Sequence, residues 1–308
     1  MNDIKLTVAV AIYNVEKYLP KCLESLLNQT EKNGYEILLI NDGSTDNSRK
    51  ICEEFIEKGL NAKIIDKENG GLTSVRNLSI DLAKGENILF LDGDDYIENE
   101  TMEIIFKELG DYDLLVFGFN WISENIVYTD ERFLENKIYD KNKKIENLIF
   151  SNKINSSVWN KIFKISILKE NNIKFLEFKS CEDIPFTNEY IQKCNNVKII
   201  NKVLYQYLYR ENSLSNQKKY DFYLNHLKLI LYFLKKINIK TDDFYNYIVK
   251  EYVYLIREMR KNNAFKNDKI LFELREKIEK NIDLIKVIFN KKLKFKMKLR
   301  YLKLKGRS

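Results

Sequence analysis

The chain has 308 residues, 44% of them hydrophobic, which is enough for about two domains with full hydrophobic cores. Its net charge of +7 is concentrated at one end: residues 291–308 hold nine Lys and Arg and no acid, and the other 43 basic residues are matched by 45 acidic ones. This balance disfavours a basic, nucleic-acid-binding body, so no nucleic-acid partner is expected.

Strands and helices alternate over the first part of the chain, which predicts an α/β fold with right-handed crossovers and a mostly parallel sheet. The apolar spacing and cap residues place strands at 7–12, 35–40, 62–66 and 87–91, and helices at 16–29, 48–58 and 73–83. Residues 44–48 supply the caps for the second of these helices.

The alternation loosens after residue 100. Helices are expected at 101–109, 143–150, 165–171 and 182–192, and strands at 113–122, 197–200 and 203–209. Three long helices without proline follow, at 220–237, 242–261 and 268–289. We place a boundary near residue 216, between a catalytic sheet domain (1–215) and a helical region (216–308) with a basic tail (291–308). This region is expected to act as a lid on the sheet or as a homodimer contact.

No apolar run is long enough to span a membrane, and residues 1–6 lack the apolar core of a signal peptide, so a cytoplasmic protein is expected. The four cysteines form no C-x-x-C pair and are expected to be reduced and packed in the core. The single histidine, His226, lies in an apolar helical run. A zinc site is therefore not expected.

Asp92-Gly93-Asp94-Asp95 directly follows the apolar strand at 87–91. Three crowded carboxylates repel one another unless a cation neutralises them, and ligands made only of oxygen select Mg²⁺ or Mn²⁺. Strand ends in an α/β sheet also bind ligands, so a metal-assisted site for an anionic, phosphate-bearing substrate is indicated. The alternatives are a capped turn, or a calcium loop ending at Glu103, although that loop lacks glycine at its sixth position.

Three other strand ends carry polar or glycine-rich segments. Asp42 follows the second strand, where it can accept a base N–H, and Tyr13-Asn14 follows the first strand, where the ring can stack on a base. Gly70-Gly71 precedes a helix that carries Arg76, and such turns bring backbone N–H groups close to phosphate. Each segment alone also fits an ordinary turn or a strand-end aromatic, and the dinucleotide fingerprint G-x-G-x-x-G is absent.

Taken together and in this order, the segments resemble family 2 glycosyltransferases, which have the GT-A fold, a Rossmann-like sheet flanked by helices. The resemblance covers roughly residues 5–215. It is carried by residues 7–19, 36–48, 69–77, 85–97, 159–161, 181–186, 209–210 and 213–215. Two positions depart from the family pattern: Ala11 replaces a proline, and Cys181 replaces a glycine beside the expected base.

The resemblance implies a role for each matching residue. Tyr13, Asn14 and Asp42 would bind the nucleobase, Arg76 would lie near the nucleotide, Asp94 would be the main metal ligand, and Asp92 would be a second ligand nearer the ribose. Asp183, in the pair Glu182-Asp183, would be the general base. Trp159, Asn160 and Lys161 would line the acceptor side, and Arg210 and Ser213 would belong to a loop that closes on the diphosphate. Alone, Glu182-Asp183 also fits an acidic helix start, and Trp159 fits a core residue.

The function expected from this pattern is inverting transfer of a sugar from a nucleotide diphosphate, a UDP-sugar, to a glycan, glycolipid or glycoprotein acceptor, with Mn²⁺ or Mg²⁺ as cofactor. The Asn-, Lys- and Ile-rich composition indicates a bacterium with an AT-rich genome, and hence synthesis of a surface polysaccharide or glycoprotein glycan. A sugar-nucleotidyltransferase is an alternative, but it would need a basic phosphate loop where residues 10–18 offer only Lys17. A non-catalytic sugar-nucleotide-binding scaffold is another.

The tail alternates basic and apolar residues, so peripheral attachment to an anionic membrane surface on the inner face of the cell membrane is expected. A solvated or partly packed terminus is the alternative.

Overall fold

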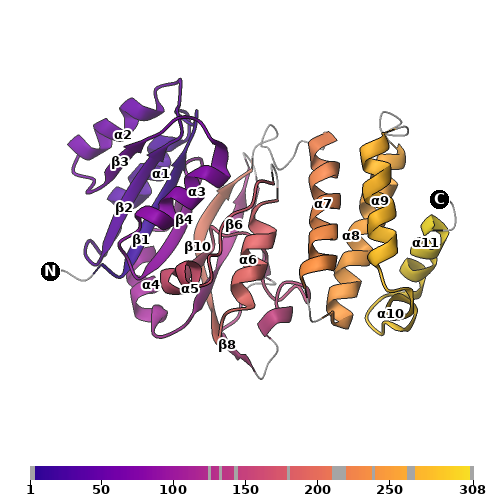
Figure 1. Cartoon of the computed structure of the whole chain (residues 1–308). Coiled ribbons are helices and arrows are strands. Elements are labelled where there is room, and N and C mark those ends of the chain that lie inside the picture. The colour runs from indigo at the N-terminus through magenta and orange to yellow at the C-terminus, as the bar shows by residue number, and fades with distance from the viewer. Residues whose placement is uncertain are drawn as a thin grey trace. The chain divides into compact units, whose positions relative to one another are not determined.

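The computed structural model (Figure 1) describes residues 4–123, 126–131, 134–141, 145–178, 181–209, 220–237, 240–261 and 268–305. The chain divides into two compact units. The sheet unit comprises Met1–Glu146, Ile154–Glu177 and Phe186–Arg210, and the helical unit comprises Asn147–Lys153, Phe178–Pro185 and Glu211–Ser308. The helical unit thus includes two short segments from before the boundary predicted near residue 216.

The sheet unit is built on a 10-stranded sheet in the order β3-β2-β1-β4-β9-β6-β10-β5, with β7 paired to β6 and β8 to β10. The strands are β1 (Leu6–Ile12), β2 (Tyr35–Asn41), β3 (Lys63–Asp66), β4 (Asn87–Asp92), β5 (Tyr96–Ile97), β6 (Leu114–Ile122), β7 (Val127–Thr129), β8 (Lys137–Asp140), β9 (Lys161–Lys164) and β10 (Asn196–Leu208). β3, β2, β1 and β4 pair in parallel, as do β6 and β10, whereas β9 runs antiparallel between β4 and β6. The expected α/β class is confirmed.

Helices connect the strands of this sheet. They are α1 (Leu19–Leu27), α2 (Ser48–Glu57), α3 (Gly71–Leu82), α4 (Thr101–Leu109), α5 (Ile165–Glu170) and α6 (Asp183–Ile191), which begins in the helical unit. β1 is apolar almost throughout and buried along its length, as expected for a parallel strand that is covered on both faces. In Figure 1, α3 packs across β1 and β2.

The register of the sheet brings three loops to one edge. Ala11 of β1 pairs with Ile40 of β2 and with Asp92 of β4, and Ile12 pairs with Asn41. The three strands therefore end side by side, and the residues that follow them share that edge.

The helical unit has its own core. It contains α7 (Tyr220–Lys236), α8 (Asp242–Lys261), α9 (Lys269–Asn281), α10 (Leu284–Phe289) and α11 (Phe295–Lys305). Phe150, Phe244 and Tyr252 are among the buried side chains at its centre. Among the residues described, no helix combines the length and the apolar composition needed to cross a bilayer.

Several predicted elements need correction. In place of a helix at 143–150 the structure has a short 3-10 turn, η3 (Ile145–Asn147). The two strands expected at 197–200 and 203–209 form the single strand β10, because a bulge between Ile199 and Val203 carries the pairing across both halves. The helix expected at 268–289 is divided into α9 and α10, since Ile282 adopts an extended conformation.

Two smaller predictions also have outcomes. Residues 44–48 cap α2 as predicted, because the Asp46 carboxylate accepts a hydrogen bond from the Ser48 N–H at 2.9 Å. The Glu16 carboxylate also binds the start of this helix, where it accepts a hydrogen bond from the Asn47 N–H at 2.9 Å. The expectation of core-packed thiols is confirmed, because the four cysteines are free and buried.

Candidate functional site

The candidate site lies where β1, β2 and β4 end. Tyr13 follows β1, Asp42 follows β2, and the Gly93-Asp94 turn follows β4. Because these strands end side by side, residues from three distant parts of the sequence share one edge of the sheet. Ligands in open α/β sheets bind at such strand ends.

Asp42 lies beneath the glycine-rich turn and is only 1% exposed. One carboxylate oxygen accepts hydrogen bonds from the Gly70 N–H at 2.9 Å and from Lys67 Nζ at 2.5 Å, and the other accepts from the Gly71 N–H at 2.8 Å. Gly71 has a φ of 78°, a left-handed conformation that glycine adopts without strain. Asp42 therefore already holds the start of α3, and a base N–H would have to join or replace one of these donors.

Tyr13 and Asn14 play different parts in the loop after β1. The Tyr13 side chain is 50% exposed, so its ring is accessible for stacking. Asn14 has a φ of 50°, a conformation that asparagine tolerates better than most residues, and its side-chain oxygen accepts a hydrogen bond from the Thr45 N–H at 2.8 Å. Asn14 thus ties the loop after β1 to the loop after β2.

Arg76 and Asp92 form an ion pair at the base of the site. Arg76 lies on α3 and is 3% exposed, and its Nη2 donates to the Asp92 carboxylate at 3.1 Å. The Arg76 guanidinium also lies 5.4 Å from the ring centre of Phe175. A buried cation therefore offsets part of the negative charge of the acidic turn.

Asp95 points into the protein, away from any shared cation site. It is 2% exposed, and its carboxylate accepts hydrogen bonds from the Tyr205 hydroxyl at 2.7 Å and from the Leu208 N–H at 2.8 Å. Burial, and then the negative charge of Asp92, raise the pKa of Asp95 well above its usual range. The expectation that all three carboxylates crowd around a cation is thereby corrected: Asp92 and Asp94 remain as candidates.

Gly93 allows the acidic turn to approach β1. A Cβ atom at this position would lie 2.7 Å from the carbonyl oxygen of Ala11, closer than such contacts occur. The Gly93 N–H donates to that same oxygen at 2.9 Å. The turn that carries Asp94 is thus fixed against the end of β1.

The carboxylates of Asp92 and Asp94 suit a hard divalent cation whose coordination shell is completed by oxygen atoms of a bound substrate. Among the residues described, no group of three or more His, Cys, Asp or Glu side chains forms a metal cage. Mg²⁺ is usually bound by one or two carboxylates together with substrate phosphates rather than by such a cage. Asp94, which is half-buried, and Asp92 are the two carboxylates here that could act as such ligands.

The three residues expected to line the acceptor side are buried in the sheet unit. Trp159 is 6% exposed and stacks on the ring of Tyr205 with centroids 4.6 Å apart. Asn160 is 0% exposed and donates to the Phe117 carbonyl at 2.8 Å. Lys161 is also 0% exposed, and its Nζ donates to the Asn155 side chain at 2.6 Å. These contacts hold the three side chains in the sheet unit, and their place on the acceptor side stays a prediction.

The expected base lies in the helical unit. Asp183 is the first residue of α6, Glu182 precedes it, and both are half-buried. Burial raises the pKa of the adjacent Cys181 thiol to about 12, and the charges of Glu182 and Asp183 add to the shift. Asp183 is suitably placed for an acid at a helix start, and its catalytic role stays a prediction. Arg210 and Ser213 lie outside the described residues.

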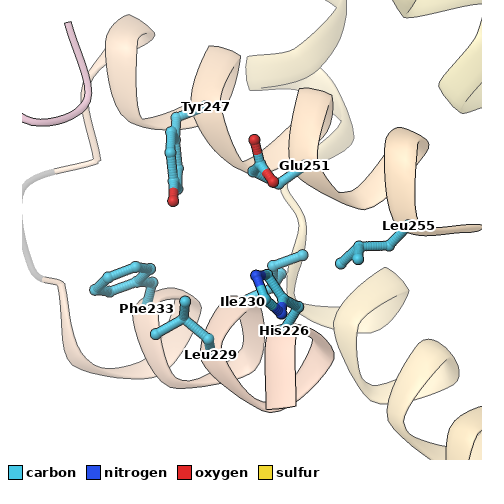
Figure 2. A pocket seen from close by; sticks show the side chains of 7 residues that line it. All are labelled: His226, Leu229, Ile230, Phe233, Tyr247, Glu251 and Leu255. Carbon is cyan, nitrogen blue, oxygen red and sulfur yellow. The ribbon is translucent and has the colours of Figure 1, made fainter. Parts of the chain in front are cut away.

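A cavity of about 10 Å³ lies in the helical unit between α7 and α8 (Figure 2). It is lined by His226, Leu229, Ile230, Phe233, Tyr247, Glu251 and Leu255. It has room for about one water molecule and is too small for a sugar nucleotide. His226 packs here as expected, with Nδ1 2.8 Å from the Phe222 carbonyl oxygen.

Sequence reasoning missed Lys67 and Tyr205. Lys67 lies three residues before the recognised glycine pair, and its nearness to Asp42 depends on the pairing of β2 with β3. Tyr205 was one of several aromatic residues in a predicted strand. No local signal distinguishes it from its neighbours.

Comparison with known proteins adds independent information. A family model described as "Glycosyl transferase family 2" matches residues 7–171. Glycosyltransferase GlyA of Streptococcus pneumoniae is 37% identical over 225 residues, which cover 69% of this chain and 32% of GlyA. The putative glycosyltransferase EpsH of Bacillus subtilis is 34% identical over 212 residues, which cover 67% of this chain and 61% of EpsH.

TarS of Staphylococcus aureus, named a poly(ribitol-phosphate) beta-N-acetylglucosaminyltransferase, is 30% identical over 210 residues, which cover 66% of this chain and 35% of TarS. The crystal structure of TarS 1–349 in complex with UDP matches with a TM-score of 0.73 at 24% identity, and the match covers 98% of this chain and 87% of that one. This likeness confirms the expected GT-A fold. The chain matches only about a third of the length of GlyA and TarS.

Proposed function

Because the chain belongs to glycosyl transferase family 2, we propose that it transfers a sugar from a nucleotide diphosphate donor, a UDP-sugar, to a hydroxyl group of a glycan, glycolipid or glycoprotein acceptor. The observation that carries this proposal is the convergence of Tyr13, Asp42 and the Gly93-Asp94 turn at one edge of the sheet. Together they offer an aromatic face, a buried acceptor and a carboxylate, which are the groups needed for a base and a diphosphate.

The nucleobase binds between the loops after β1 and β2 in this proposal. The exposed ring of Tyr13 supplies a stacking surface, and the Asp42 carboxylate accepts an N–H of the base. Lys67 and the two glycine N–H groups keep Asp42 in place before the nucleotide arrives. A preorganised acceptor costs less to order on binding.

The diphosphate lies over the acidic turn. Asp94 and Asp92 would hold Mn²⁺ or Mg²⁺ beside the diphosphate, and Arg76 fixes the Asp92 carboxylate through their ion pair. A divalent cation bound there would supply Lewis-acid stabilisation of the charge that develops on the leaving diphosphate.

The acceptor hydroxyl loses its proton to Asp183, with Glu182 beside it in the sequence. A single displacement inverts the anomeric centre, so an α-linked donor gives a β-linked product. The name of TarS, a beta-N-acetylglucosaminyltransferase, supports this stereochemistry. Its poly(ribitol-phosphate) acceptor also supports a surface polysaccharide as the product of this chain. A cytoplasmic location, a homodimer and the closing loop with Arg210 and Ser213 are further parts of the proposal.

Isothermal titration calorimetry of UDP and GDP with Mn²⁺ tests the proposal at its centre. We expect UDP to bind more weakly after chelation of the metal and in the Asp94→Ala variant. Asp81→Ala, which removes an exposed carboxylate from α3, is the matched control and should bind UDP as the unmodified protein does. UDP and GDP association that is indifferent both to chelator and to Asp94→Ala would contradict the enzyme proposal.

A further inference from the structure

The last helix, α11, carries two apolar stripes on different faces. Phe295, Leu299 and Leu302 are spaced four and three residues apart, so they lie on one face, and their side chains are 73%, 40% and 36% exposed. We call this set the outward stripe. A helix of a water-soluble unit normally buries its apolar face, so a second, exposed stripe calls for an explanation.

The other face of α11 anchors the helix in the core of the helical unit. Met297, Tyr301 and Leu304 repeat the same spacing, and Tyr301 and Leu304 are 0% and 5% exposed. The ring of Tyr301 lies 6.0 Å from that of Tyr252 on α8. This inward stripe fixes α11 without help from the outward stripe. Residues 295–305 are thus a packed helix rather than a loose terminus.

Basic residues border the outward stripe on both sides. At 3.6 residues per turn, Lys296 and Lys303 fall on one side of it and Lys298 on the other. The Lys298 Nζ donates to the Ile288 carbonyl at 2.6 Å, which connects α11 to the end of α10. No acidic residue occurs anywhere in 291–308.

The same character continues onto the end of α10. Phe289 is 76% exposed, and the connection to α11 adds exposed Lys291 and Lys294. Lys292 differs, because it pairs with Asp243 at 2.6 Å and its charge is largely balanced. Phe289 and the outward stripe therefore lie among lysines with few opposing charges.

We propose that the outward stripe, together with Phe289, is a surface that inserts into the interface of an anionic lipid bilayer. The apolar side chains enter the boundary of the acyl chains, while the exposed Lys296 and Lys303 bend toward the headgroups and meet their negative charge. The inference goes beyond sugar transfer and does not depend on it. Only one face of α11 contacts the bilayer in this proposal, because the inward stripe packs in the core of the helical unit.

The charges and the apolar side chains of this surface favour a bilayer over other binding partners. A soluble polyanion such as a nucleic acid or an acidic glycan would engage the lysines but would leave Phe295, Leu299 and Leu302 in water. A second copy of the chain would cover the apolar stripe but would bring two basic borders together, which costs energy. An anionic bilayer satisfies both the apolar and the charged groups.

Sedimentation of the full chain with vesicles tests the proposal. The probes are phosphatidylcholine vesicles with and without phosphatidylglycerol. We expect binding to the phosphatidylglycerol vesicles that weakens with salt. Lys296→Gln with Lys303→Gln should weaken binding about fivefold for each charge removed. Phe295→Ser with Leu299→Ser should weaken it roughly tenfold or more, because the buried apolar area is lost.

The controls distinguish vesicle binding by the outward stripe from nonspecific hydrophobic adsorption. Val127→Ser with Tyr128→Ser removes two side chains that are 64% and 56% exposed on β7, and it should leave vesicle binding unchanged. Circular dichroism and UDP titration should show that each variant stays folded. Three results would overturn the proposal: stripe variants that bind vesicles normally, capture by soluble dextran sulfate with no response to the stripe substitutions, or a dimer in analytical ultracentrifugation that the stripe substitutions abolish while vesicle binding remains absent.

Discussion

The hydroxyl of Tyr205 donates a hydrogen bond of 2.7 Å to the carboxylate of Asp95, across 110 residues of sequence. The same hydroxyl lies 3.4 Å from the Asp92 N–H, and the ring of Trp159 stacks against the tyrosine. The Leu208 N–H binds the other oxygen of Asp95. The acidic turn after β4 is thus attached to the end of β10, so the position of Asp94 depends on a strand from the far end of the sheet unit.

Loss of the Asp95 carboxylate is expected to destabilise the sheet unit. Asp95→Ala leaves the Tyr205 hydroxyl and the Leu208 N–H without their acceptor, which should cost about 1–3 kcal/mol in the free energy of unfolding. Asp95→Asn should cost less, since an amide can still bond to both groups. Urea unfolding measures the difference. Asp111→Ala, at an exposed position, should change stability by less than about 0.5 kcal/mol, and an equal loss in all three variants would contradict this role.

Replacement of Asp42 by asparagine should weaken nucleotide binding. The substitution removes the charge that pairs with Lys67 and one of the acceptors for the glycine turn. Hydrogen bonds to charged groups contribute about 1.5–3 kcal/mol, so the Kd for UDP should rise roughly tenfold or more in calorimetry. Glu53→Gln removes an exposed charge from α2 and serves as the control. An unchanged Kd in Asp42→Asn would show that this carboxylate only supports the turn.

The Asp183→Asn variant is expected to lose transfer while it keeps nucleotide binding. A general base is worth about 10²–10⁴ in rate, so turnover should fall by that factor with the Kd for UDP unchanged. Glu177→Gln, which alters an exposed acid before the same segment, should keep its turnover. If Asp183→Asn turns over normally, the base must be another group.

The stereochemistry of the product is a separate prediction. A single displacement from an α-linked UDP-sugar gives a β-linked product, because the acceptor attacks from the face opposite the leaving group. Proton NMR of the first product formed distinguishes the two anomers by their coupling constants. An α-linked product would rule out the single displacement while leaving donor binding untouched.

The helical unit should show a pH-dependent stability that involves Glu251. Burial raises the pKa of Glu251 above its ordinary value, against a smaller opposing effect of Lys250. A raised acid pKa means that the folded protein holds the proton more tightly than the unfolded chain does. The contribution of Glu251 to folding stability is therefore complete below its pKa in the unfolded chain, and it is lost as the pH rises through its pKa in the folded protein. Glu251→Gln should therefore gain stability relative to the unmodified protein between acidic and neutral pH.

Thermal melts over this pH range measure that effect. His226 lines the same cavity, and burial lowers its pKa (Figure 2). The contribution of His226 to folding stability has the opposite pH dependence. It is complete above the pKa of His226 in the unfolded chain and is lost as the pH falls through its pKa in the folded protein. His226→Gln should thus reduce the fall in melting temperature on the acidic side of the pH range. If the melting temperatures of Glu251→Gln and of the unmodified protein changed equally with pH, Glu251 would not be the group responsible.

Much of the site could be predicted because its signals are local. Apolar runs identified β1, β2 and β4, and the polar residues that follow them in sequence were the site candidates. Parallel strands end at one edge, so sequence order alone implied that Tyr13, Asp42 and Asp94 come together. The short strands β5, β7, β8 and β9 were missed, because two to four residues give too little periodicity.

The sequence by itself determined the alternation of strands and helices, the chemistry offered at each strand end and the basic character of the tail, since each depends on neighbouring residues. Tertiary structure alone decided which of three adjacent carboxylates turns inward, that Trp159, Asn160 and Lys161 are buried, and which apolar face of α11 meets the core. Those outcomes depend on contacts such as that of Asp95 with Tyr205, and a side chain's environment is set by partners that only the folded chain brings near.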